Sequence, residues 1–244
     1  MVILPDSLGP RKTKHICTKE TRQRVPRPTL ITDAYDANTY LSKLPYVDKT
    51  RIAFVGWSTG GTTVIHALGP YHLAYQNPSP GQDVVKFSHG VAFYPWCWGK
   101  RNSIFYAPLL ILAGDKDDWG SEVCGDNLGN RRTDKIPVEV VYYKGAYHGF
   151  DAPGKLRTYR GHKVGYNKAA HQDSIKRVKA FLEAKTIIIS TEAAALWICK
   201  ATSTTGPHWG RGWNISKTAA SQRAMFECIK RGGGCRVTSC KPPQ

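Results

Sequence analysis

The sequence predicts an α/β fold: a mostly parallel sheet with helices on both faces, followed by a small α+β module. Short apolar runs typical of buried strands alternate with segments that favour helices. A serine between glycines stands where one such run gives way to a helix. After about residue 185 the composition shifts to serine, threonine, glycine and cysteine. We therefore expect one domain over residues 1–185 and a cysteine-rich module over residues 191–244.

The first apolar run lies at the N-terminus, where Val2, Ile3 and Leu4 predict a strand that is already under way and ends in a turn. A helix is expected next, over residues 33–44. Its apolar residues recur at helical spacing and give it one apolar face. They are Ala34, Ala37, Tyr40, Leu41 and Leu44.

Four apolar runs bounded largely by glycine or proline predict the strands of the parallel sheet. They are residues 51–55, 90–96, 107–114 and 136–143. An amphipathic helix is expected at residues 171–184, where an apolar stripe repeats every three to four residues. Residues 69–90 contain several prolines and are expected to form an excursion between elements.

The C-terminal module is expected to contain a strand, a glycine turn, a second strand, a helix and a short strand over residues 235–240. Four of the seven cysteines lie here, which favours disulfides and an oxidising compartment. Zinc is the alternative, but the spacings form no paired Cys-x-x-Cys knuckles and no close histidine pair accompanies them. These four are Cys199, Cys228, Cys235 and Cys240.

The charge pattern limits the partners that we expect. The 35 Lys and Arg against 18 Asp and Glu give a formal net charge of +17, which favours anionic surfaces. The basic residues are scattered and no nucleic-acid-binding motif organises them, so we expect no specific nucleic acid and at most weak anionic-surface binding. No apolar run approaches the roughly 20 residues of a transmembrane helix, so none is expected.

The stretch RIAFVGWSTGGTTVIHAL places Ser58 at a predicted strand-to-helix turn. Gly56 and Gly60 complete the G-x-S-x-G pattern of a nucleophile elbow, in which small neighbours avoid collision, and Trp57 lies between the first glycine and the serine. The backbone N–H of Thr59, at the start of the helix, would then face an oxyanion. The pattern alone is also compatible with a simple glycine-rich turn.

A catalytic serine needs a base and an orienting carboxylate, which in this kind of fold follow it in the order acid, then histidine. Both residue types occur in that order, each directly after a predicted strand. The candidate acids are Asp115, Asp117 and Asp118, and the candidate base is His148. The other histidines are less suitable because they lie on the elbow helix, after the last strand or in the tail. They include His66, His162, His171 and His208.

With these residues in place, residues 1 to about 184 resemble the dienelactone hydrolase family of α/β-hydrolases. The matching blocks are VILPDSLGPR, DAYDANTYLSKLPYVDKTRIAFVGWSTGG, PLLILAGDKDDW and YYKGAYHGFD. The resemblance implies Ser58 as nucleophile, His148 as base and Asp117 as acid, with Asp118 as the fallback. Founding members use cysteine where this chain has Ser58, which leaves ester hydrolysis expected but puts dienelactone itself in doubt.

Family members begin with a strand and a His-Gly loop that donates a second N–H to the oxyanion. The sequence starts at what resembles the following strand, so the resemblance implies an α/β-hydrolase-type sheet that lacks the first strands. The chain is then either N-terminally incomplete or a degenerate member of the family, and the intact set of candidate catalytic residues favours the first. Removing one oxyanion donor typically lowers the rate by about 100- to 1,000-fold.

The tail resembles a cysteine-containing module of exported bacterial proteins, on the blocks ALWICKATSTTG, GRGWNISKTAASQRAMFEC and GGGCRVTSC. This resemblance implies disulfides in the tail, for which Cys199–Cys228 and Cys235–Cys240 are the candidate pairs. Separately, Cys97 and Cys124 are a candidate for a further pair near the site, and the sequence alone does not fix the connectivity. The resemblance of the tail also implies a periplasmic or secreted protein; otherwise the protein is cytoplasmic.

The function expected from these observations is a serine hydrolase that cleaves a small carboxylic ester or lactone through an acyl-enzyme on Ser58. Such a reaction needs no metal and no organic cofactor. The alternative is a catalytically impaired hydrolase remnant that binds an anionic or glycan polymer.

Overall fold

The computed structural model describes residues 1–69, 85–97, 105–129, 136–184, 197–204, 209–214, 228 and 234–241. The chain forms two compact units, Met1–Thr186 and Ile187–Gln244. No helix in these described ranges is both long and apolar enough to span a membrane.

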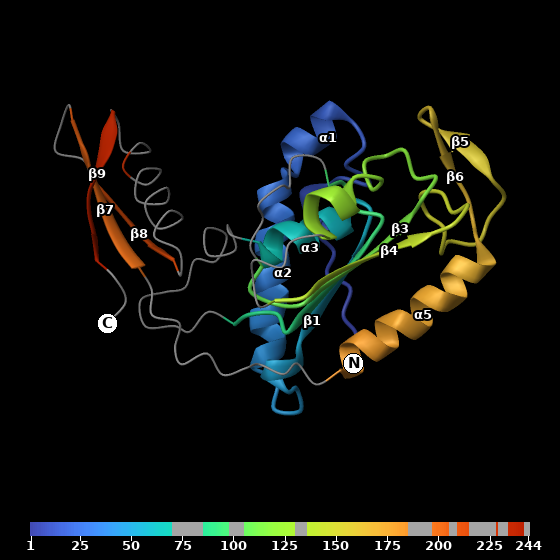
Figure 1. Ribbon diagram of the computed structural model, residues 1–244, viewed down its shortest axis with the longest axis horizontal. Coiled ribbons are helices and arrows are strands. Elements are labelled where there is room, and N and C mark those ends of the chain that lie inside the picture. The colour runs from blue at the N-terminus through green and yellow to red at the C-terminus, as the bar shows by residue number, and fades with distance from the viewer. Residues whose placement is uncertain are drawn as a thin grey trace. The chain divides into compact units, whose positions relative to one another are not determined.

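The first unit contains a parallel four-stranded sheet in the order β1-β2-β3-β4 (Figure 1). Its strands are β1 (Ala53–Trp57), β2 (His89–Phe93), β3 (Leu109–Gly114) and β4 (Val138–Tyr143). The register pairs Trp57 with Phe93, and Gly114 with Tyr143. The carboxyl ends of the strands therefore lie along one edge of the sheet, where the loops that follow them converge.

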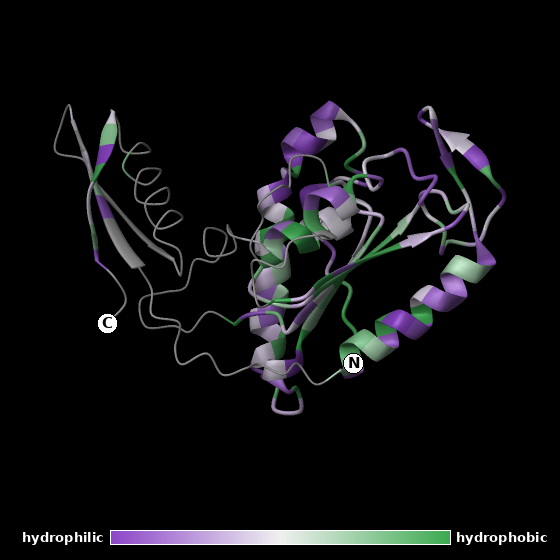
Figure 2. Cartoon of the chain, in the orientation of Figure 1, coloured by the Kyte–Doolittle hydropathy of each residue, from purple (hydrophilic) through white to green (hydrophobic). Residues whose placement is uncertain are grey.

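Helices cover both faces of this sheet, as predicted. On one face, α2 (Arg27–Ser42) and α3 (Thr59–Leu68) pack Ile31, Tyr35 and Leu68 into one apolar core. On the other face, α5 (Lys168–Glu183) packs Val178 and Phe181 into a second core. Figure 2 shows apolar residues concentrated along the central strands, whereas polar and apolar residues alternate along α5. This alternation is the pattern expected of a helix that covers a sheet and faces water on its other side.

Two element boundaries differ from the predictions for local reasons. The helix predicted from residue 33 begins at Arg27, because Pro28 lies in the first turn, where a missing N–H costs no hydrogen bond. The strand predicted from residue 51 begins at Ala53. A short 3₁₀ helix, η2 (Lys49–Arg51), precedes it, and the Asp48 carboxylate accepts a hydrogen bond from the Thr50 N–H.

The predicted strand at Val2–Leu4 is wrong. Residues 1–5 form no strand, and the side chains of Val2 and Leu4 are 85% and 86% exposed. A 3₁₀ turn, η1 (Gly9–Arg11), and a short capped helix, α1 (Lys19–Arg24), follow this segment. An apolar run becomes a strand only when it pairs with a neighbour, which its local composition cannot guarantee.

A hairpin that was not predicted follows β4. It joins β5 (Arg157–Tyr159) to β6 (His162–Val164) through a two-residue turn, in which Arg160 and Gly161 have φ of 54° and 88°. Two residues with positive φ are typical of the turn that matches the twist of a hairpin. The Gly165 N–H donates to the His148 carbonyl at 3.2 Å, so the hairpin is joined to the loop after β4.

The second unit contains an antiparallel sheet in the order β8-β7-β9, made of β7 (Trp197–Ser203), β8 (Trp209–Asn214) and β9 (Cys235–Lys241). Most of the helix predicted before β9 lies outside the described residues, as do residues 70–84 of the predicted excursion.

The two disulfides implied for this unit are wrong. Cys228 is bonded to Cys235, and Cys240 is also disulfide-bonded. Cys235 and Cys240 lie at opposite ends of the extended strand β9. At about 3.4 Å per residue their Cα atoms are roughly 17 Å apart, well beyond the roughly 7 Å that a disulfide spans.

Candidate active site

Three loops at the carboxyl edge of the parallel sheet bring the predicted serine, histidine and aspartate together. The Nε2 atom of His148 lies 2.9 Å from Oγ of Ser58, and its Nδ1 atom lies 3.0 Å from Oδ2 of Asp117. If Nδ1–H donates to the carboxylate, Nε2 is left to accept the serine proton. The three side chains thus form one hydrogen-bonded row.

Ser58 occupies a sharp turn between β1 and α3. Its φ of 52° and ψ of −115° are unusual for a residue with a side chain. The Ser58 N–H donates to the carbonyl of Phe93 at 2.9 Å, and the Ser58 carbonyl accepts from the Thr62 N–H at 2.9 Å. These backbone bonds hold the turn while its side chain points to His148.

The two glycines of the G-x-S-x-G pattern have different roles. A Cβ placed on Gly56 would lie 2.4 Å from the backbone carbonyl of Gly60, so position 56 has no room for a side chain. A Cβ on Gly60 would meet nothing in the described chain within 4 Å. The expectation that Gly60 must be small to avoid a collision is therefore wrong. The backbone of residue 60 is what leaves no room for a side chain at residue 56.

This asymmetry predicts opposite outcomes for two alanine variants. Gly56→Ala should lower the free energy of unfolding by about 3 kcal/mol, because backbone cannot move aside as a flexible side chain can. Gly60→Ala should change it by less than about 1 kcal/mol, because alanine suits a helical position. Urea denaturation of both variants measures the difference. Equal losses would contradict the assignment of the crowding to Gly56.

Asp117 is buried and every oxygen of its carboxylate has a partner. Oδ1 accepts from the backbone N–H of Trp119 at 3.0 Å, and Oδ2 faces both His148 and the Oγ atom of Ser121, the latter at 2.8 Å. The Ser121 hydroxyl also lies 2.9 Å from the carbonyl of Pro95. Asp117 is therefore held in one orientation, with one oxygen aimed at the histidine.

The other candidate acids face elsewhere. Asp118, the expected fallback, is 63% exposed and pairs with His162, whose Nδ1 lies 3.0 Å from its Oδ1. Asp115 accepts a hydrogen bond from the Gly145 N–H at 2.7 Å. The structure thus brings Asp117, and neither of its neighbours, to His148.

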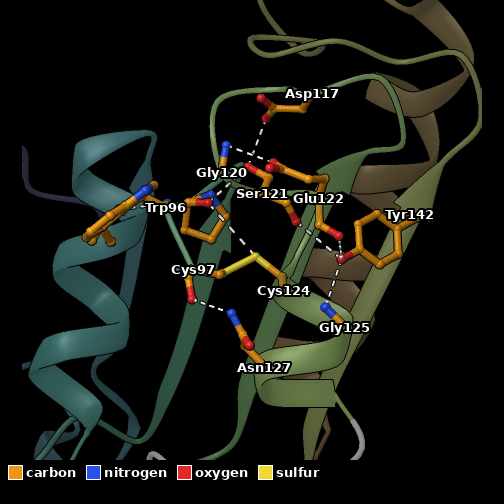
Figure 3. The surroundings of a disulfide bond; sticks show 12 residues. Trp96, Cys97, Asp117, Gly120, Ser121, Glu122, Cys124, Gly125, Asn127 and Tyr142 are labelled. Carbon is orange, nitrogen blue, oxygen red and sulfur yellow. Dashed lines mark hydrogen bonds between the residues drawn. A yellow bond between two sulfur atoms is a disulfide. The ribbon is translucent and has the colours of Figure 1, made fainter. Parts of the chain in front are cut away.

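A disulfide between Cys97 and Cys124 lies beside the Asp117 loop, which confirms the pair expected near the site (Figure 3). The Cys97 N–H donates to the Gly120 carbonyl at 3.0 Å, and the Asn127 amide donates to the Cys97 carbonyl at 2.9 Å. The bond and these contacts join the loop after β2 to the loop after β3. They fix the backbone from which Ser121 reaches Asp117.

Two aromatic rings contact His148. The ring centroids of Tyr94 and Trp119 lie 4.6 and 4.8 Å from the imidazole centroid. The Tyr94 hydroxyl donates to Oδ1 of Asp151 at 2.7 Å, and the Trp57 indole N–H donates to Oδ2 of the same carboxylate, also at 2.7 Å. Burial, followed by the charge of Asp151, raises the pKa of Tyr94 well above its ordinary value, so this hydroxyl stays protonated.

Sequence reasoning missed Tyr94, Trp119 and Asp151. Tyr94 directly follows β2, and its position at a strand end was a usable signal. Asp151 lies in the loop after β4, three residues after His148. The Asp151 carboxylate joins the elbow, through Trp57, to the ring that contacts the histidine.

Thr59 is the first residue of α3. N–H groups in the first turn of a helix have no acceptor inside the helix, and they stabilise negative charge. The Thr59 N–H therefore has no acceptor within α3. Across the described residues, no group of three or more His, Cys, Asp and Glu side chains is arranged to hold a metal ion.

The model of the dienelactone hydrolase family matches residues 2–186. No curated protein sequence matches the chain.

Several solved structures align with part of this chain. Dipeptidyl peptidase 4 of Porphyromonas gingivalis is 20% identical, with a TM-score of 0.46 over 67% of this chain and 24% of its own. A dienelactone hydrolase-like promiscuous phosphotriesterase from metagenomic libraries is 19% identical, with a TM-score of 0.49 over 70% and 68%. A thermophilic esterase of Thermogutta terrifontis is 18% identical, with a TM-score of 0.49 over 66% and 67%.

This chain therefore spans about a quarter of the first of these proteins and about two thirds of the other two. The family model, in contrast, matches far more than half of this chain, from the N-terminal segment to the end of α5. The chain belongs to the dienelactone hydrolase family.

Proposed function

We propose that the protein is a serine hydrolase that cleaves a small carboxylic ester or lactone through an acyl-enzyme on Ser58. The observation that supports this most strongly is the hydrogen-bonded row of Ser58, His148 and Asp117, with distances of 2.9 and 3.0 Å. A serine hydroxyl is nearly inert at neutral pH, and this arrangement supplies the base and the orienting carboxylate that activate it.

In the proposed reaction, Oγ of Ser58 attacks the ester carbonyl while its proton passes to Nε2 of His148. The buried carboxylate of Asp117 stabilises the imidazolium that forms. The Thr59 N–H stabilises the negative charge on the carbonyl oxygen. His148 then gives its proton to the departing alkoxide, and the acyl group stays on Ser58 until a water, activated by the same histidine, releases it as a carboxylic acid.

We also propose that the protein works in an oxidising compartment and is periplasmic or secreted. The Cys97–Cys124 and Cys228–Cys235 disulfides support this, because such bonds persist mainly outside the reducing cytosol.

A fluorophosphonate probe tests the proposed chemistry, because it reacts with an activated serine. The wild-type chain should carry one covalent adduct on Ser58, located by peptide mass spectrometry. Ser58→Ala should lose the adduct, whereas Ser42→Ala, at the end of α2, should keep it. A folded wild-type chain that the probe does not label would rule the proposal out.

A further inference from the structure

A second histidine–carboxylate pair lies beside the first. The consecutive residues Asp117 and Asp118 pair with different imidazoles, those of His148 and His162. The Trp119 ring contacts both imidazoles: its centroid lies 4.8 Å from that of His148 and 4.6 Å from that of His162. The contact with His162 is a parallel stack, with an interplanar angle of 15°.

The hairpin places His162 next to the loop of the candidate base. His162 is the first residue of β6, and Val164 lies two residues later, on the same face of that strand. Val164 forms an isolated β-bridge with His148. Tyr159 lies opposite His162 in the hairpin, and its ring centroid is 5.9 Å from that of Trp119. The hairpin thus supplies the surface against which Trp119 packs.

A contribution to folding stability does not account for the His162–Asp118 pair. The side chains of His162 and Asp118 are 32% and 63% exposed, and exposed ion pairs contribute little to folding. In contrast, Trp119 contacts both members of the His148–Asp117 pair. Its ring packs on His148, and its backbone N–H donates to Oδ1 of Asp117. A change in the position of Trp119 would therefore reach both the base and the acid.

We propose that His162, held by Asp118, is a positioning residue that acts through Trp119. Its stacked ring keeps the indole against His148, which restricts rotation of that imidazole and keeps its two nitrogens aligned with Asp117 and Ser58. The terminal torsion of histidine is broad, so packing has to select the orientation that proton transfer requires. A misplacement of about 1 Å can lower the rate by about 100-fold. This inference rests on the function proposed above.

Three variants test this role in the full chain. His162→Ala removes the stack and should lower kcat for p-nitrophenyl acetate by about three- to tenfold with KM little changed. His162→Phe keeps a planar ring over Trp119 and should recover most of the lost kcat. His15→Ala, a matched change at an exposed histidine of the N-terminal segment, should behave as wild type.

Proton NMR provides a readout that does not depend on turnover. The Nδ1 proton of His148, shared with Asp117, should give a downfield resonance that is absent in His148→Ala. In His162→Ala this resonance should broaden or move upfield, and in His162→Phe it should return. A kcat and a resonance that both stay unchanged in His162→Ala would overturn the inference. So would a His162→Phe variant as impaired as His162→Ala, since the stacked ring would then not be the operative feature.

The same experiments separate the two proposals. If wild type neither hydrolyses the ester nor reacts with a fluorophosphonate, the proposed function fails, and the His148 resonance alone decides whether His162 orients the imidazole. If wild type is active but the His162 variants are indistinguishable from it, the positioning role fails and the proposed function stands.

Discussion

Replacing His148 by alanine is expected to lower kcat for ester hydrolysis by about 10⁴- to 10⁶-fold. Within the described ranges, the imidazole Nε2 atom is the basic group within hydrogen-bonding distance of Ser58 Oγ, at 2.9 Å. Without it, the serine proton has no acceptor and the hydroxyl remains a poor nucleophile. Steady-state kinetics with p-nitrophenyl acetate measure the loss, and the rate of fluorophosphonate labelling should fall with it.

The loss should occur in kcat, with KM changed much less, because a general base acts on the reacting atoms in the transition state. His15→Ala is the matched control and should retain wild-type kinetics. Circular dichroism and thermal unfolding should show that His148→Ala remains folded. A folded variant with activity within tenfold of wild type would mean that another group accepts the proton.

The sheet could be predicted from the sequence because its central strands are buried on both faces. All residues of β2 and β3 are buried, and apart from His89 at the start of β2 each strand is free of polar side chains. The candidate site followed from the same pattern, since Ser58, Asp117 and His148 each come soon after such a run. Carboxyl ends of parallel strands meet at one edge, which makes residues distant in the sequence neighbours in space.

The β5–β6 hairpin could not be predicted from apolar patterning. Each strand has three residues, and β5 is exposed along its whole length. The remaining signal was the Arg160–Gly161 turn, and Gly161 in second position is typical of two-residue hairpins. His162 follows the last apolar strand in the sequence, yet the hairpin brings its ring against Trp119.

The incorrect disulfides and the incorrect first strand have a shared physical cause. A strand needs a neighbouring strand and a disulfide needs a second cysteine, and the tertiary structure determines which residues are close enough to pair. Val2 and Leu4 are apolar enough for a strand but lie exposed. Cys235 and Cys240 are close in sequence, but the extended conformation of β9 keeps them apart.

Replacing Asp117 by asparagine is expected to lower kcat by about 10⁴-fold, the effect typical of this change in a serine–histidine–aspartate site. The backbone N–H of Trp119 is a fixed donor to Oδ1 and would select the amide oxygen for that position. The amide NH₂ would then face Nδ1 of His148. This group can only donate, so the imidazole would carry its proton on Nε2 and could not accept one from Ser58.

Asp118→Asn provides a control at the adjacent position with the same chemical change. Asp118 faces His162, and the amide oxygen can still accept a hydrogen bond from that imidazole, so kcat should fall by less than about tenfold. Comparison of the two variants by steady-state kinetics therefore separates loss of the orienting carboxylate from loss of one negative charge near the site. Among the described acidic residues, only Asp117 lies within hydrogen-bonding distance of His148. Similar losses of kcat in the two variants would therefore mean that the negative charge, and not the hydrogen bond to His148, is what matters. A much larger loss in Asp117→Asn would instead show that the tautomer of a single imidazole determines whether Ser58 can react.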